Sequence, residues 1–192
     1  EASREFGWYN RNTGHNPFTR DGKKTASFEI AEGLGWDVPD VVFVSVGDGN
    51  IISGLWKGFK DLHSLGLIDR LPRMASVQAE KSDAVKRAFE SDGVIRPVSG
   101  ETIADSISVS LPRDGIAAVQ ALKESKGFAV SVTDEEILEA MRVTARRESV
   151  FAEPAGAAPV AGLKKAAKAG LVKASDTIVA LVTGNGLKDT AS

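Results

Sequence analysis

The chain of 192 residues is long enough for one domain with an appendage, and 42% hydrophobic with 26% charged residues is typical of a globular protein. A net charge of −2 argues against a nucleic-acid or membrane-surface partner, and no apolar run approaches the roughly 20 residues that span a bilayer. Having no cysteine and only two histidines, the chain lacks ordinary metal ligands, so we expect a cytoplasmic protein without a metal.

The first 24 residues contain most of the loop signals in the chain. Asn12, Gly14, the pair Asn16-Pro17 and the pair Asp21-Gly22 all favour turns. We therefore expect residues 1–24 to be a lead-in from a missing N-terminal domain. Residues 25–192 are expected to form one larger domain.

Four almost continuously apolar runs are predicted to be strands that are covered on both faces. They span residues 41–46, 74–79, 128–132 and 177–183. Residues 93–127 are less periodic, and we expect one helix and a surface excursion there.

Helical patterns alternate with these runs. After the first run, apolar residues recur at spacings of three and four, as on one face of a helix: Ile52, Leu55, Phe59, Leu62 and Leu65. A shorter helix follows Ser82, a capping box at Thr133 predicts a helix through Met141, and Pro154 begins a helix that ends on Gly170. The alternation predicts an α/β fold, a doubly wound, mostly parallel sheet with helices on both faces.

The stretch SVGDGNIISG, residues 45–54, joins the first strand to its helix. A helix N-terminus after a glycine turn offers free backbone N–H groups to an anion. The spacing nevertheless fits neither a dinucleotide-binding loop, because Ile52 replaces the third glycine, nor an ATP-binding loop, because Leu55 and Trp56 follow Gly54. A simple packing turn is an equally good interpretation of the loop taken alone.

Asp48 is the awkward residue of this loop. A carboxylate about 4 Å from a phosphate costs on the order of 4 kcal/mol at an effective dielectric constant near 20. If the loop holds phosphate, the Asp48 side chain must therefore turn away, where it can accept from other backbone N–H groups.

A second glycine turn, TGNGLKD, follows the last strand and begins at Thr183. Open α/β sheets bind ligands at the carboxyl ends of their strands, so the Thr183 hydroxyl is a candidate ligand contact. A threonine that caps its own turn is the simpler interpretation when this segment is taken alone.

Together these segments resemble the C-terminal half of the threonine synthase family, pyridoxal-phosphate enzymes of the tryptophan-synthase-β fold, or fold type II. The resemblance rests on ASFEIAEGLGW, VGDGNIISGLWKGFKDL, VQAE, TDEEILEAMR, FAEPAGAAPVAGL and LVTGNGLKD. It implies that the glycine loop holds the cofactor phosphate, that Thr183 faces the pyridine nitrogen, and that Glu153 lies near the ring. The cofactor-binding residues so implied are Gly47, Asp48, Gly49, Asn50, Ile51, Thr183 and Glu153.

One departure from the family is the lysine that carries the cofactor as a Schiff base. The family has it in an SFKDR-like motif in the N-terminal half, and none of the lysines here has that context. We therefore expect no catalytic residue in this chain, a lysine upstream, and no activity from the fragment alone. The missing N-terminal half and a second copy, in a homodimer, are the expected partners.

The other departure concerns the substrate. The family holds the phosphate of O-phosphohomoserine with an asparagine–serine pair and an arginine after NP. Here Thr13 and Gly14 stand at the pair and Thr19 stands at the arginine, while Arg20 comes one residue later. The substrate contacts implied by position are Asn16, Thr19 and Arg20. Because DGNIISG also matches the loop of serine and threonine dehydratases, an ammonia-lyase acting on a hydroxyamino acid and a non-catalytic phosphate-binding module remain alternatives.

Overall fold

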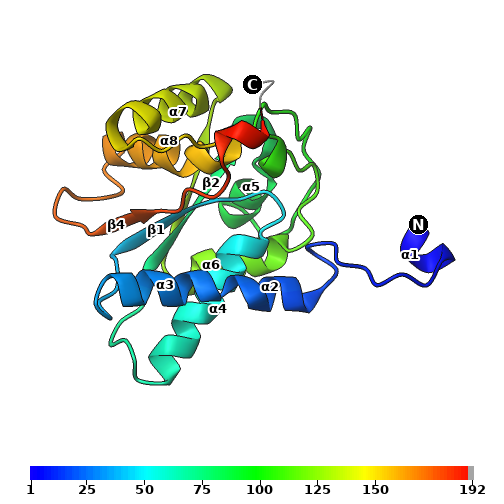
Figure 1. Cartoon of the computed structure of the whole chain (residues 1–192), viewed down its shortest axis with the longest axis horizontal. Helices are drawn as coiled ribbons and strands as arrows, with labels where there is room; N and C mark the ends of the chain where they lie inside the picture. The colour runs from blue at the N-terminus through cyan, green and yellow to red at the C-terminus, as the bar shows by residue number, and fades with distance from the viewer. Residues whose placement is uncertain (190–192) are drawn as a thin grey trace.

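Four parallel strands form the centre of the structure, a computed structural model that describes residues 1–189 (Figure 1). Their hydrogen-bonded order is β3-β2-β1-β4, and every neighbouring pair is parallel. The strands lie where the apolar runs predict them: β1 (Val41–Ser45), β2 (Arg73–Ala79), β3 (Phe128–Val132) and β4 (Ile178–Ala180). β4 is shorter than predicted, because after Leu181 the chain leaves the sheet and turns toward the helix that begins at Pro154.

Helices and short 3-10 turns connect the strands. They are α1 (Ala2–Glu5), α2 (Pro17–Lys23), α3 (Thr25–Gly33), α4 (Asn50–Ser64), η1 (Glu80–Ser82), α5 (Ala84–Phe89), η2 (Asp105–Ile107), α6 (Gly115–Glu124), α7 (Asp134–Glu148), α8 (Pro154–Lys168) and η3 (Gly186–Lys188). Among residues 1–189, no helix is both long and apolar enough to cross a bilayer.

Both faces of the sheet are covered, which confirms the predicted doubly wound α/β fold. Side chains of β1 alternate between two cores, with Val42 and Val44 in one and Val41 and Phe43 in the other. The first core is closed by α3, α4, α5 and α6, and the second by α7 and α8 (Figure 1). This double burial explains why the strands read as apolar runs without polar alternation.

The predicted helices agree with the structure except at their ends. Leu65, expected on the apolar face of α4, is instead the C-cap of that helix and is 73% exposed. The predicted capping box at Thr133 is present, but α7 continues past Met141 to Glu148, because no helix breaker intervenes before Ser149 adopts a left-handed conformation. Residues 93–127 contain α6 and an irregular stretch with η2, as expected.

The N-terminal segment is joined to the fold through two glycines of α4. A Cβ on Gly54 would lie 2.7 Å from the Arg20 carbonyl oxygen, and one on Gly58 would lie 2.6 Å from the Lys24 carbonyl oxygen. The absent side chains let the backbone of α2 and α3 pass directly over α4. By contrast, α1 and the residues that follow it extend away from the body (Figure 1). A domain boundary between residues 24 and 25 stays a prediction.

The strand order reverses beside β1. The chain moves outward from β1 through β2 to β3, and β4 then returns to the other side of β1. The loops after β1 and β4 therefore diverge to opposite faces, which leaves a crevice between them at the carboxyl edge of the sheet. Both glycine turns that the sequence singles out lie at this edge.

Candidate functional site

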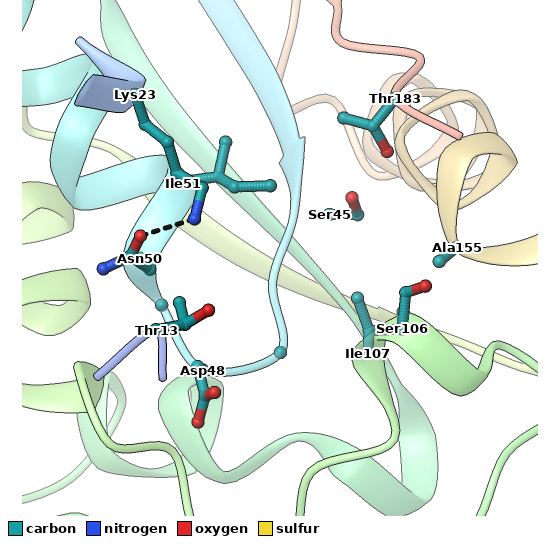
Figure 2. A pocket seen from close by; sticks show the side chains of 12 residues that line it. Thr13, Lys23, Ser45, Asp48, Asn50, Ile51, Ser106, Ile107, Ala155 and Thr183 are labelled. Atoms are coloured by element: carbon teal, nitrogen blue, oxygen red, sulfur yellow. Dashed lines mark hydrogen bonds between the residues drawn. The ribbon is translucent and has the colours of Figure 1, made fainter. Parts of the chain in front are cut away.

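A cavity of about 170 Å³ lies at this crevice, and the glycine loop after β1 forms one wall (Figure 2). Its other walls come from the segment before α2, the irregular stretch near η2, the start of α8 and the turn after β4. The lining residues are Thr13, Lys23, Ser45, Gly47, Asp48, Gly49, Asn50, Ile51, Ser106, Ile107, Ala155 and Thr183. The structure thus brings together six of the seven predicted cofactor-binding residues, with Glu153 as the exception.

The backbone of the glycine loop carries a run of free donors. Among the described residues, the N–H groups of Gly47, Asp48, Gly49, Asn50 and Ile51 have no protein acceptor. The last two belong to the first turn of α4, a 15-residue helix whose N-terminus carries a partial positive charge. Donors of this kind, at the edge of a cavity, fit a phosphate group.

The two glycines of the loop have a packing role. A Cβ on Gly47 would lie 3.0 Å from Ile107 Cα, and one on Gly49 would lie 2.9 Å from the Asp114 carbonyl oxygen. Gly49 also has a φ of +90°, which other residues rarely adopt. The loop is therefore pressed against residues 106–118, and both of its interpretations hold at once: the glycines pack, and the N–H groups stay free.

The Asp48 side chain turns away from the cavity (Figure 2). Its Oδ1 accepts the backbone N–H of Arg113 at 3.1 Å, and its carbonyl oxygen accepts the N–H of Asp114 at 2.9 Å. This confirms the expected orientation of the carboxylate. The N–H that it accepts belongs to a residue 65 positions further along the chain, so Asp48 ties the loop to the start of α6.

Asn50 joins a cation to an anion at the first residue of α4. Its Oδ1 accepts from Lys23 Nζ at 2.6 Å, and its Nδ2 donates to Asp114 Oδ2 at 2.5 Å (Figure 2). Burial lowers the pKa of the Lys23 ammonium group, while the charges of Asp114 and Asp48 offset part of that effect. The Asn50 side chain is thus occupied by protein groups, and its backbone N–H is what faces a ligand.

Thr183 and Glu153 lie on the side of the cavity formed by β4 and α8. Thr183 lines the cavity opposite the glycine loop (Figure 2). Glu153 is buried beneath the TGNG turn, and its Oε2 pairs with Lys188 Nζ at 2.9 Å. It makes no side-chain cap bond to α8, so helix capping does not account for it. It lines a neighbouring cavity instead, with Ser106, Ala155 and Lys188 among its other walls.

The three predicted substrate residues lie outside the lining of this cavity. The Asn16 side chain caps α2 by accepting from Phe18 N, and the Thr19 hydroxyl donates to the Asn16 carbonyl oxygen. Arg20 lies in a separate groove beside Trp56 and Lys57, where its guanidinium group is 3.7 Å from Asp114. A substrate contact for any of the three stays a prediction.

Sequence reasoning missed several lining residues: Thr13, Lys23, Ser45, Ser106, Ile107 and Ala155. A signal existed for Ser45 and Ala155, because Ser45 ends a strand at the ligand-binding edge and Ala155 begins a helix there. Lys23 looked like one of two lysines after a turn. Only the packing of α2 over Gly54, where a Cβ would lie 2.9 Å from Lys23 Cβ, directs it toward the loop.

Comparison with protein-family models gives a match over residues 1–184 to the family described as "Pyridoxal-phosphate dependent enzyme". Among curated proteins, the chain is 44% identical to the threonine synthase of Methanocaldococcus jannaschii over 176 residues, which are 91% of this chain and 44% of that protein. It is 46% identical to the threonine synthase of Mycobacterium bovis over 91% of this chain and 46% of that protein. The chain thus spans less than half the length of these relatives.

Solved structures also match. A threonine deaminase from the organism given as T.th. is 26% identical, with a TM-score of 0.76 over 96% of this chain and 64% of its own. A threonine deaminase from Solanum lycopersicum is 23% identical, with a TM-score of 0.79 over 95% of this chain and 50% of its own. The second likeness speaks for the fold alone.

Proposed function

This chain belongs to the pyridoxal-phosphate dependent enzyme family, and we propose that it is the cofactor-binding C-terminal part of a threonine synthase, which converts O-phosphohomoserine to threonine and phosphate. The observation that carries the proposal is the run of five free backbone N–H groups, residues 47–51, which faces Thr183 across one cavity. The identity of 44–46% with threonine synthases supports the choice within the family.

The residues of the cavity fit pyridoxal phosphate. The N–H groups of residues 47–51 hold its phosphate, and Asp48 does not oppose this, because its carboxylate is bound to the Arg113 N–H. When bound, the cofactor supplies an electron sink for a carbanion formed on an amino-acid substrate. The protein contributes the position of the ring and the electrostatics around it.

Thr183 sets the electrostatics at the ring nitrogen. Its hydroxyl group offers one hydrogen bond and no charge, so it leaves the nitrogen largely unprotonated and limits electron withdrawal. Glu153 acts from beneath the turn that carries Thr183. An added Cβ on Gly184 would overlap with the Glu153 carboxyl group, and Glu153 N donates to the Gly184 carbonyl oxygen at 2.9 Å, so this residue positions the turn.

The remaining parts of the enzyme come from outside these residues. We place the lysine that carries the cofactor in the N-terminal half, which the relatives possess in addition to the matched region. β4 supports docking of that half, because it lies at one edge of the sheet and its three residues are only half-buried. The chain alone is inactive in this proposal, and the complete protein is a cytoplasmic homodimer with a small amino-acid substrate.

The test uses the full-length protein loaded with pyridoxal phosphate. Incubation with O-phosphohomoserine is expected to release equal amounts of phosphate and threonine, and incubation with homoserine is the matched control without a leaving phosphate. An enzyme that binds the cofactor but releases no phosphate from O-phosphohomoserine would refute the threonine synthase assignment.

A second candidate is an ammonia-lyase that acts on serine or threonine. Two observations favour it: the threonine deaminase from T.th. has the same fold at 26% identity, and Arg20 pairs with Asp114 outside the cavity instead of lining it. Formation of a 2-oxo acid and ammonia from threonine, without phosphate release from O-phosphohomoserine, would select this activity.

A non-catalytic phosphate-binding module is the third candidate. Pyridoxal phosphate stabilises a protein that binds it in the folded state, by an amount that grows with the ratio of ligand concentration to the dissociation constant. If the cofactor fails to raise the melting temperature of the full-length protein while inorganic phosphate does raise it, the module is the better description.

A further inference from the structure

Lys23 places a positive charge in the cavity without an anionic partner in the protein. It is the only cationic side chain among the described lining residues, and no carboxylate of residues 1–189 lies within ion-pair distance of its Nζ. Its one hydrogen-bond partner among these residues is the neutral amide oxygen of Asn50, at 2.6 Å. A half-buried ammonium group without a counter-ion is costly, so this charge favours a bound anion.

The position of Lys23 is built into the helix packing. At Gly54 of α4, an added Cβ would lie 2.9 Å from Lys23 Cβ and 2.7 Å from the Arg20 carbonyl oxygen. Only a residue without a side chain lets α2 approach so closely, and this approach brings Lys23 over the first turn of α4 (Figure 2). The ammonium group thereby lies on the same side of the loop as the free N–H groups of Asn50 and Ile51.

The neighbouring cation does not serve the same purpose. Arg20, three residues earlier on α2, directs its guanidinium group into the groove beside Trp56 and Lys57, where it faces Asp114. Lys24 pairs with Asp21 and Asp61, both at 3.4 Å. Lys23 is the cation of this segment whose charge the described part of the protein leaves uncompensated.

We propose that the Lys23 ammonium group is the counter-ion of a phosphate monoester dianion bound between it and the loop 47–51. This inference rests on the proposed function and adds the residue that neutralises the phosphate. Two sources share this chemistry, the phosphate of the cofactor and the phosphate of the amino-acid substrate. An ammonium–phosphate contact is charge-assisted and therefore stronger than the N–H contacts around it.

The test compares Lys23→Gln with Lys24→Gln in the full-length protein, because the two variants make the same charge change at adjacent positions. One arm measures the dissociation constants of pyridoxal phosphate and pyridoxal for the apoprotein. The other arm measures those of O-phosphohomoserine and homoserine for the cofactor-loaded protein, from the change in cofactor absorbance.

Lys23→Gln is expected to weaken binding of the phosphate ligand about tenfold or more in one arm, with less than about a twofold change for its phosphate-free partner. The arm that responds identifies the source of the phosphate. Lys24→Gln is expected to change neither arm, and Lys23→Arg to recover most of the loss. Equal behaviour of Lys23→Gln and Lys24→Gln, or equal losses for ligands with and without phosphate, would overturn the proposal.

A measurement on the unmodified protein covers the case in which Lys23→Gln does not fold. Lysine acetylation is followed by mass spectrometry with and without inorganic phosphate, and Lys24 and Lys57 serve as internal references. Phosphate is expected to protect Lys23 and not the references; equal rates at Lys23 with and without phosphate would refute the proposal. Because both tests score binding, they stand even if O-phosphohomoserine is bound and not turned over, an outcome that would refute only the proposed function.

Discussion

Asp48 is a negative charge next to a loop that otherwise attracts anions. Its carboxylate is useful as a hydrogen-bond acceptor, because it holds the Arg113 N–H and so joins the loop to the segment before α6. Its charge has no such use, and it repels a phosphate bound to the N–H groups nearby. The two properties of this side chain can be separated by substitution.

We expect Asp48→Asn to bind pyridoxal phosphate more tightly, by roughly two- to fivefold, because an amide oxygen still accepts the Arg113 N–H while the charge is gone. Solvent screening keeps the effect of a partly exposed charge modest. The dissociation constant is measured on the full-length apoprotein at low ionic strength. Asp48→Ala is the matched control: it also removes the charge but leaves the N–H without its acceptor, so its affinity is expected to lie below that of Asp48→Asn. Weaker binding by Asp48→Asn than by the unmodified protein would contradict this account.

The contact of α4 with α2 and α3 decides where the N-terminal segment lies. Gly58 is the tightest point, since an added Cβ would overlap with the Ser27 hydroxyl and lie 2.6 Å from the Lys24 carbonyl oxygen. Close approach of helix backbones at small residues fixes the position of one helix on another.

We expect Gly58→Ala to lower the free energy of unfolding by about 1–3 kcal/mol, because the added methyl group forces α3 away from α4. Gly33→Ala is the matched control: Gly33 is also helical, has open space around its missing Cβ, and is expected to be neutral or stabilising by up to about 1 kcal/mol. Urea unfolding of both variants measures the difference. Equal effects would show that the α3–α4 approach has no special role.

At the scale of the whole molecule, stability depends on pH through Glu124, whose carboxylate joins α6 to α4. Hydrogen bonds from Lys60, Trp56 and Gln120 hold its pKa at about 2, below the ordinary value of 4.5. Because the folded-state pKa is lowered, this stabilisation is fully present above pH 4.5 and is lost as pH falls toward about 2. We expect Glu124→Gln to flatten the fall in unfolding free energy over that range, as measured by urea titration at several pH values. An unchanged slope would contradict the assignment, and Glu90→Gln serves as a surface control.

The sheet could be predicted because its strands are buried on both sides. Val41, Phe43 and their neighbours read as a continuous apolar run for that reason, and the same holds for the other strands. The glycine loop and Thr183 were also predictable, since they follow strands and lie at the edge where such sheets bind ligands. These features depend on local pattern and on one general rule of topology.

The directions of Lys23 and Arg20 could not be predicted in the same way. They differ by three positions on one short helix, yet one faces the cavity and the other faces Asp114 in a separate groove. That difference depends on how α2 crosses α4 at Gly54, a contact between segments that are remote in sequence. Residues 93–127 were obscure for a related reason, because Ser106 and Ile107 are held against the loop by packing and not by a repeating pattern.

The position of β4 also has a consequence for the order of folding. β4 pairs with β1, and beside this pair Thr177 N donates to Asp40 Oδ2 across 137 positions of sequence. Contacts between such distant segments form slowly, because a long loop must close first. The phosphate-binding wall can form as soon as β1 and α4 exist, whereas the Thr183 wall arrives only when β4 docks. Cofactor capture therefore reports on one of the last steps of folding, and the cofactor can secure that step once it has occurred.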